Sequence, residues 1–197
     1  MFDLMRDFRA FRDTFGPPIP GSGRPPTSFG LDDGGTLVTF AAEVGTGIFR
    51  EGLLSICSTR EGDGDLGEWT PYLPVGCRHF ASGAFGALFA LCGEDLWIVD
   101  PHYGQVLESD ISLGGFFEAF ADAGLLQGFL KEGLFEEWRA MSGGPLEEDV
   151  LCPNPVPALG GDWRLASLKP VSLMSLMSLT AQLLGSHGGG QIEVRRL

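Results

Sequence analysis

Lysine is nearly absent from this sequence, since Lys131 and Lys169 are the only two lysines among its 197 residues. With the scattered arginines they give 13 basic residues against 26 acidic ones, and a formal net charge of −13. Proteins that bind nucleic acid meet the phosphates with clustered Lys and Arg, and basic surfaces also favour anionic membranes. The composition therefore argues against direct binding to nucleic acid or to an anionic membrane.

Long apolar runs are missing too. The longest, Ala84 to Cys92 and Leu173 to Leu184, fall short of the roughly 18 residues that cross a membrane, and glycine or serine interrupts them. The segment Met1 to Asp7 mixes acidic with apolar side chains, and it contains no basic stretch followed by an apolar one. We therefore expect no membrane span, no signal peptide and a cytoplasmic location.

Cysteine and histidine are scarce, with four and three residues respectively. In a chain of this size without a signal peptide, we expect the cysteines to be reduced core residues and not a disulfide framework. One stretch contains residue types that bind zinc, namely Cys77, His79, Cys92 and His102. Structural zinc sites use tighter paired spacings than these. We predict no metal and no cofactor.

Motifs of several enzyme classes do not occur. There is no Gly-x-Ser-x-Gly nucleophile motif, and the stretch Gly83 to Gly86 lacks the Lys and the Ser or Thr of a phosphate loop. The acidic turn that begins at Asp63 does not follow the calcium-loop pattern. We predict that the chain is not an enzyme. The open alternative is a hydrolase that uses His79, His102 and nearby acids.

Apolar and turn-forming residues are plentiful. Hydrophobic residues make up 44% of the chain and include 15 Phe and 4 Trp, which is enough to bury a core that offsets the ordering entropy of folding. The 30 Gly and 13 Pro exceed average usage and predict many turns between short elements.

Helical spacing of apolar residues marks five segments. In the first, the apolar residues follow one another at steps of four and three, as Leu4, Phe8, Phe11 and Phe15. The second segment also fits a strand, and we favour the helix because Gly45 can end it. The expected helices are Phe2 to Phe15, Thr36 to Val44, Ser112 to about Gly124, a segment from Phe129 to about Arg139, and Leu173 to Leu184 as a core helix.

Short apolar runs separated by turn residues predict an antiparallel meander in the middle of the chain. The expected strands are Gly52 to Cys57, Ala84 to Cys92, Leu96 to Val99 and Gln105 to Leu107. We expect Ser142 to Gly161 to be a loop, and Gln191 to Arg196 to be an edge strand or a frayed tail. The predicted fold class is α+β, with a central, mostly antiparallel sheet packed by helices.

Three segments resemble known families. Phe11 to Pro18, continued by Thr36 to Leu54, resembles the GAD-like domain, in which a helix ending in Phe-Gly-Pro leads into a Pro-containing crossing. Ser82 to Gly104 is similar to the sheet of the C-terminal domain of type VI secretion immunity proteins. Glu148 to Gly161, followed by the Met- and Leu-rich helix, resembles the closing signature of that domain.

The resemblance implies a GAD-like part over residues 1–75 and an immunity part over residues 76–197 that together form one compact unit. It also implies an immunity protein that stays in the cytoplasm and neutralises a secreted toxin, commonly a DNase effector of the type VI system. Such a toxin needs a basic surface, and an acidic inhibitor can mimic the charge of its phosphates.

The charge is concentrated between Glu94 and Asp162, where 14 acidic and two basic residues leave a net −12. A basic partner is the simplest interpretation of such a field. From this stretch we predict the partner-binding residues Asp95, Asp110, Glu136, Glu137, Glu147, Glu148 and Asp149. Two alternatives stay open, an enzyme that reverses a modification made by a toxin and a regulatory interaction module.

Overall fold

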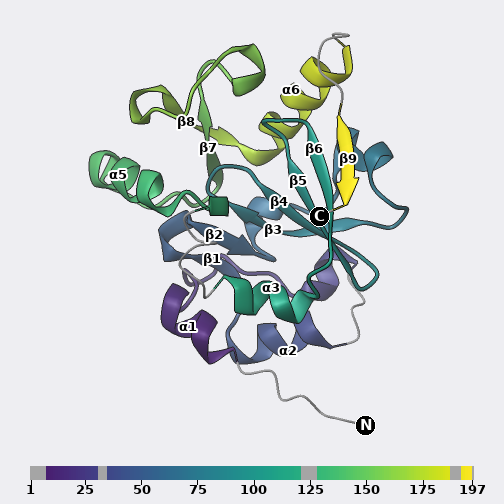
Figure 1. The fold of residues 1–197 in the computed structure, drawn as a ribbon. Coiled ribbons are helices and arrows are strands. Elements are labelled where there is room, and N and C mark those ends of the chain that lie inside the picture. Colours follow the sequence, from purple (N-terminus) through teal and green to yellow (C-terminus); the bar gives the residue numbers. More distant parts are fainter. Residues whose placement is uncertain (1–7, 31–34, 121–127, 187–191, 197) are drawn as a thin grey trace.

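A seven-stranded sheet forms the middle of the molecule, with its strands in the order β1-β2-β3-β4-β5-β6-β9 (Figure 1). The computed structural model describes residues 8–30, 35–120, 128–186 and 192–196. The strands are β1 (Gly47–Phe49), β2 (Leu54–Ile56), β3 (Arg78–Gly83), β4 (Leu88–Cys92), β5 (Asp95–Asp100), β6 (Gln105–Ser109) and β9 (Glu193–Arg196). All neighbours are antiparallel except β9, which is parallel to β6. The predicted α+β class is confirmed, and the sheet continues across residue 75.

The predicted meander is present as β4, β5 and β6. Its first strand begins at Leu88 and not at Ala84, because residues 84–87 form the turn after β3, with Gly86 at a φ of +78°. The expectation missed β1 and β3. In β3, the polar side chains of His79 and Ser82 are buried among apolar residues, which disguises the apolar pattern. The expected strand Gly52 to Cys57 is confirmed in part as β2.

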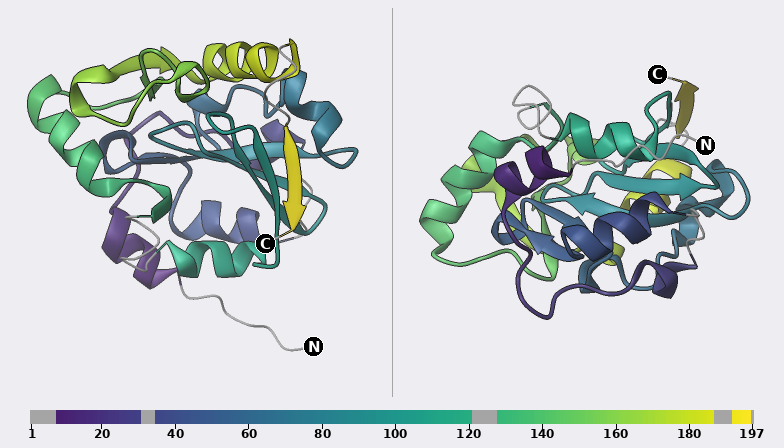
Figure 2. Two further views of the ribbon diagram at one scale, coloured as in Figure 1. Left: turned by 45° about the horizontal axis from the view of Figure 1, so that its top comes forward. Right: turned by 90° about the horizontal axis from the view of Figure 1, so that it is seen from below.

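Three helices cover one face of the sheet, α1 (Arg9–Phe15), α2 (Thr36–Glu43) and α3 (Leu113–Ala119) (Figure 2). Their phenylalanines interlock, and the rings of Phe40 and Phe117 stack with their centroids 4.0 Å apart. Ser112 caps α3 as predicted, since its hydroxyl accepts the Gly115 N–H. These helices confirm the first three helical predictions where the residues are described; Leu4 and residues 121–124 lie outside the described part.

The opposite face carries α6 (Leu173–Ser186) and a two-stranded sheet of β7 (Asp149–Pro153) and β8 (Leu168–Ser172) (Figure 2). The predicted loop from Ser142 to Gly161 is therefore wrong in its middle, where β7 pairs with β8. The helix α6 buries Leu176 and Met177 but leaves Met174 and Leu179 more than 40% exposed, so it is a core helix on one face. The indole N–H of Trp69 donates to the Met177 carbonyl at 3.0 Å.

The remaining elements lie at the edges or connect the layers. The helix α5 (Glu132–Ser142) begins after Lys131, later than predicted. The 3-10 helices are η1 (Pro26–Phe29), η2 (Arg50–Gly52), η3 (Thr59–Glu61), η4 (Gly67–Tyr72), η5 (Pro157–Leu159) and η6 (Leu165–Ser167). In the described part of the chain, no helix has the length and apolar character needed to span a membrane. The segment ending at Arg196 is the edge strand β9.

Candidate functional site

The predicted contact residues on α5 lie in a group of charges that also includes the turn after β1. Arg50 forms ion pairs with Glu132 and, at 3.1 Å, with Glu136. Arg139, one turn further along α5, forms an ion pair with Glu51. The turn and the helix are far apart in the sequence, so these pairs place α5 against the edge strand β1.

Backbone geometry at the turn directs these two side chains. Arg50 and Glu51 both have positive φ angles, 45° and 56°, which non-glycine residues adopt only where the surrounding structure holds them. The loop that follows α5 holds them in this conformation, because the Leu146 N–H donates to the Glu51 carbonyl at 2.7 Å. The buried Arg60 guanidinium also donates to the carbonyls of Gly52, at 3.2 Å, and Leu146, at 2.5 Å. Burial lowers the pKa of Arg60 to about 10.

We name this region the α5 edge; its acidic members are Glu51, Glu132, Glu136, Glu137, Glu147, Glu148 and Asp149. With Arg50, Arg139 and the buried Arg60, seven acidic side chains and three arginines leave a formal charge of −4. Glu136 is held by arginines, whereas the exposed carboxylates of Glu137, Glu147 and Glu148 form no ion pair with any residue that the structure describes. Those three are the members available to a partner.

The other two predicted contact residues lie at the opposite end of the sheet. Asp95 begins β5 and Asp110 directly follows β6, where Arg196 of β9 donates to the Asp110 carboxylate at 3.3 Å. Since β1 and β9 are the two edges of the seven-stranded sheet, Asp95 and Asp110 are remote from the α5 edge. The structure thus divides the seven predicted residues into a group of five and a group of two.

The histidine that starts the candidate catalytic pair, His79, is buried in the sheet. Its ring lies next to the backbone and the carboxylate of Glu61, which favour the protonated form, but burial outweighs them and lowers its pKa. Nearby, the fully buried Glu61 carboxylate accepts hydrogen bonds from Ser82 Oγ at 2.8 Å, from the Ser58 N–H at 2.6 Å, and from the hydroxyls of Ser55 and Ser58. This cluster lies inside the protein, where a substrate cannot contact it.

The expectation of four reduced cysteines needs a correction, because Cys77 and Cys92 form a disulfide. They directly flank the register pair Arg78 and Leu91 of β3 and β4, so the strand pairing brings them face to face. Cys57 and Cys152 are free and buried. Within the described ranges, no three His, Cys, Asp or Glu residues could jointly hold a metal ion, so the four zinc-type residues do not converge.

The second candidate histidine, His102, lines a pocket of about 430 Å³ beside β4, β5 and β6. Its Nε2 lies 2.8 Å from the Phe85 carbonyl, which makes Nε2 the protonated nitrogen, and its backbone N–H donates to Asp100 at 3.0 Å. Burial lowers the pKa of His102, so the ring is neutral at pH 7. The pocket is lined by Phe85, Ala87, Ile98, Asp100, His102, Gln105, Leu107, Gly128, Phe129 and Lys131.

Lys131 contributes the cationic group of this pocket. It precedes α5 with a φ of 48°, and its ammonium lies 4.7 Å from the ring centroid of Trp163 and 5.8 Å from that of Phe85. Burial lowers its pKa. Trp163 is held in turn by an indole N–H donated to the Tyr103 hydroxyl at 2.7 Å. The site is a half-buried ammonium between aromatic rings.

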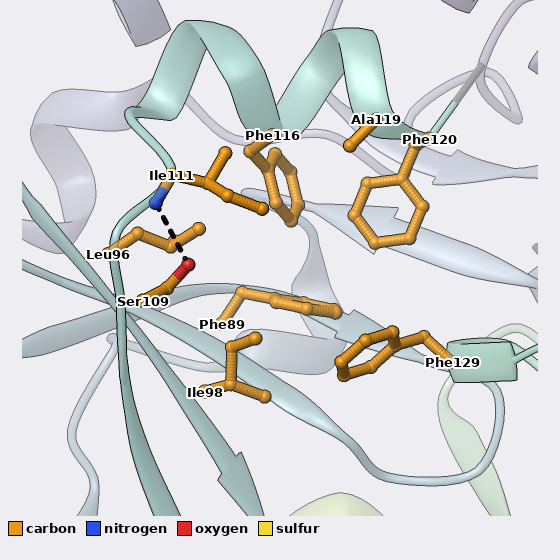
Figure 3. A pocket seen from close by; sticks show the side chains of 9 residues that line it. All are labelled: Phe89, Leu96, Ile98, Ser109, Ile111, Phe116, Ala119, Phe120 and Phe129. Atoms are coloured by element: carbon orange, nitrogen blue, oxygen red, sulfur yellow. Dashed lines mark hydrogen bonds between the residues drawn. The ribbon is translucent and has the colours of Figure 1, made fainter. Parts of the chain in front are cut away.

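An apolar hollow of about 40 Å³ adjoins the pocket, between the sheet and α3 (Figure 3). Phe89 and Ile98 come from the sheet and face Phe116 and Phe120 of α3, with Phe129 beside them. Ile98 and Phe129 line both cavities. These two side chains therefore stand between the pocket and the hollow.

Sequence reasoning missed both Lys131 and the pair Arg50 and Glu51. The rarity of lysine was a usable signal for Lys131, because a residue type used twice in an acidic chain invites an explanation at each position. No comparable signal marks Arg50 or Glu51, whose positions depend on backbone conformations that only the fold reveals.

Comparisons with known proteins show the fold and nothing further. No protein-family model matches the chain, and no curated protein matches it significantly. The crystal structure of Atu4351 from Agrobacterium tumefaciens is similar, with a TM-score of 0.66 and 19% sequence identity, over 96% of this chain and 92% of that one. At this identity the likeness supports a shared architecture over nearly the full length of both chains.

Proposed function

We propose that this chain is a cytoplasmic immunity protein that binds a cognate secreted antibacterial toxin and neutralises it by forming a stoichiometric complex. The resemblance of its segments to type VI secretion immunity proteins suggests a DNase effector as the toxin. The observation that carries the proposal is the α5 edge, whose exposed carboxylates of Glu137, Glu147 and Glu148 form no ion pair with a described residue.

Charge complementarity explains how this edge would act. A DNase needs cationic side chains around its active site to hold phosphates, and an acidic surface attracts those same side chains. Complementary fields also raise association rates, which matters for an inhibitor that must capture its toxin before DNA is cut. Glu137, Glu147 and Glu148 are exposed and lack ion pairs with described residues, so binding breaks no internal contact of theirs.

The edge is also ordered before a partner arrives. The hydrogen bonds from Leu146 to Glu51 and from Arg60 to Gly52 and Leu146 fix the loop that carries Glu147 and Glu148. A preformed surface avoids part of the entropy cost that association imposes on loops. This supports a rigid acidic surface as the toxin-binding element.

Charge reversal tests the proposal. We expect the triple variant Glu137→Lys, Glu147→Lys, Glu148→Lys to bind the toxin encoded next to its gene about 100-fold more weakly or worse, and to stop protecting cells. A matched control reverses three exposed acids on other helices, Asp13→Lys, Glu43→Lys and Glu118→Lys. Binding by calorimetry and survival on toxin expression are the measurements. Equal protection by both triple variants would overturn the proposal.

The pocket at His102 favours an enzyme as the second candidate, a hydrolase acting on a modification made by a toxin. His102 is buried like His79, with 3% of its surface exposed, but it lines this cavity together with Asp100. Titration with excess toxin separates the two functions. Protection by an inhibitor ends at a fixed ratio of this protein to toxin. An enzyme protects below that ratio, and the variant His102→Asn should abolish this protection.

A further inference from the structure

Among the described residues, the carboxylate that acts on the Lys131 ammonium is that of Asp100, which lies in the same pocket but beyond ion-pair distance. No described residue forms a hydrogen bond or ion pair with it, although the chain has 26 acidic residues, and its contacts are the rings of Phe85 and Trp163. Lys169, the other lysine, is exposed and therefore solvated. A half-buried cation normally has a counter-charge, because burial removes part of its hydration.

We propose that the Lys131 pocket binds a small organic carboxylate with an apolar body, whose carboxylate pairs with the Lys131 ammonium. The pocket volume of about 430 Å³ lies in the range of small-molecule sites, and its walls are mostly apolar with a few polar groups. This binding site is separate from the α5 edge and does not depend on the toxin-binding function.

The charges of the pocket favour a ligand with one negative charge over a ligand with two. Among the described lining residues, Lys131 is the one cation, while Asp100 places a carboxylate in the same cavity. Asp100 repels any anion in the cavity, and it repels a phosphate with two negative charges about twice as strongly as a monocarboxylate at the same place. Gln105 and Asp100 supply acceptors for a hydroxyl or amino group on the ligand.

The apolar part of the ligand would contact apolar side chains that line the pocket. Phe85, Ile98 and Phe129 line the pocket, and Ile98 and Phe129 also face the apolar hollow of Figure 3. An aromatic ring or short acyl chain attached to the ligand's carboxylate therefore contacts these apolar side chains. Such burial favours carboxylic acids with an apolar body over small hydrophilic acids such as acetate.

The test compares an acid with its uncharged isostere. The probe is 3-phenylpropionate, and 3-phenylpropionamide has the same shape without the charge. Binding is followed on the ¹⁵N-labelled full chain through the indole N–H signals of its four tryptophans, with Trp163→Phe assigning the Trp163 signal. We expect the acid to shift the Trp163 signal saturably, and the amide to bind at least tenfold more weakly.

A pair of lysine variants locates the charge. Lys131→Met should bind the acid no better than the native chain binds the amide, while Lys169→Met should bind the acid as the native chain does. Equal binding of acid and amide, no saturable shift of Trp163, or undiminished binding by Lys131→Met would overturn the proposal. The acid-to-amide ratio of the native chain decides the question even if Lys131→Met folds poorly.

Discussion

Gly52 and Leu146 contact each other backbone to backbone, so closely that a Cβ on Gly52 would lie 2.1 Å from the Leu146 carbonyl oxygen. Gly52 also has a φ of +113°, a conformation that other residues rarely adopt. The contact fixes the loop of the α5 edge against the turn after β1. No larger residue fits between the two segments.

We therefore expect Gly52→Ala to lower the free energy of unfolding by about 3 kcal/mol or more, from overpacking and backbone strain together. Gly143→Ala is the matched control, because Gly143 has a φ of +74° but a Cβ added to it would meet no described atom within 4 Å. Strain alone should cost the control about 1 kcal/mol. Urea unfolding measures both, and similar losses would show that the Gly52 contact is loose.

The buried Glu61 carboxylate gives the second prediction. Glu61→Ala leaves the hydroxyls of Ser55 and Ser82 without their acceptor and removes the carboxylate next to buried Arg60. We expect a loss of about 3–5 kcal/mol in unfolding free energy, against less than about 0.5 kcal/mol for the exposed Glu137→Ala. Chemical denaturation compares the two variants. A small loss at Glu61 would mean that the serines find other partners.

Protonation of the buried histidines gives the third prediction. Burial lowers the pKa of His79 and of His102, so below about pH 6.5 the unfolded chain binds protons that the folded chain does not. Stability should therefore fall as the pH drops below about 6.5, by up to about 1.4 kcal/mol per pH unit for each histidine, until the folded-state pKa is reached. Denaturation curves between about pH 7 and pH 5 measure the slope.

The variant His79→Leu isolates one histidine. Leucine cannot be protonated, and it places an apolar side chain at a position that is fully buried. The dependence of the unfolding free energy on pH should become shallower in this variant, and the dependence that remains should come from His102. An unchanged slope would show that His79 does not titrate differently in the two states.

The Cys77–Cys92 pair gives a fourth prediction, which concerns redox state and location. A reducing cytoplasm disfavours disulfides, whereas the two strands hold these cysteines with their Cα atoms 4.2 Å apart. Because the proposed location is a reducing cytoplasm, we expect alkylation of freshly lysed cells under denaturing conditions to modify all four cysteines, and alkylation of the air-oxidised protein to modify the two free ones. Mass spectrometry counts the adducts. Two adducts in the freshly lysed sample would contradict a reducing location.

Much of the fold could be predicted from local sequence patterns. The phenylalanines of α1 and the capping Ser112 of α3 act within their own helices, and the turn at Gly93 joins strands that are neighbours in the sequence. These features need only a short stretch of chain to form, so a short stretch of sequence predicts them.

Features that depend on how separate segments pair could not be predicted from the sequence. The strand β7 pairs with β8, whose sequence includes the unpromising Pro170, and the Cys77–Cys92 bond depends on the register of β3 and β4. The Lys131 pocket likewise joins residues from β5, β6 and the start of α5. Each of these requires the tertiary arrangement and leaves no periodic signal in the chain.

The parallel pairing of β9 with β6 has a consequence for how the protein opens. The residues Glu193–Arg196 are all exposed and meet a strand more than 80 positions earlier, so this contact closes the longest loop of the sheet with little apolar burial in return. We expect its amide hydrogens to exchange with solvent well before those of the central strands. Each such opening leaves β6 as a bare strand edge that can accept a strand from another molecule, and aggregation should begin there.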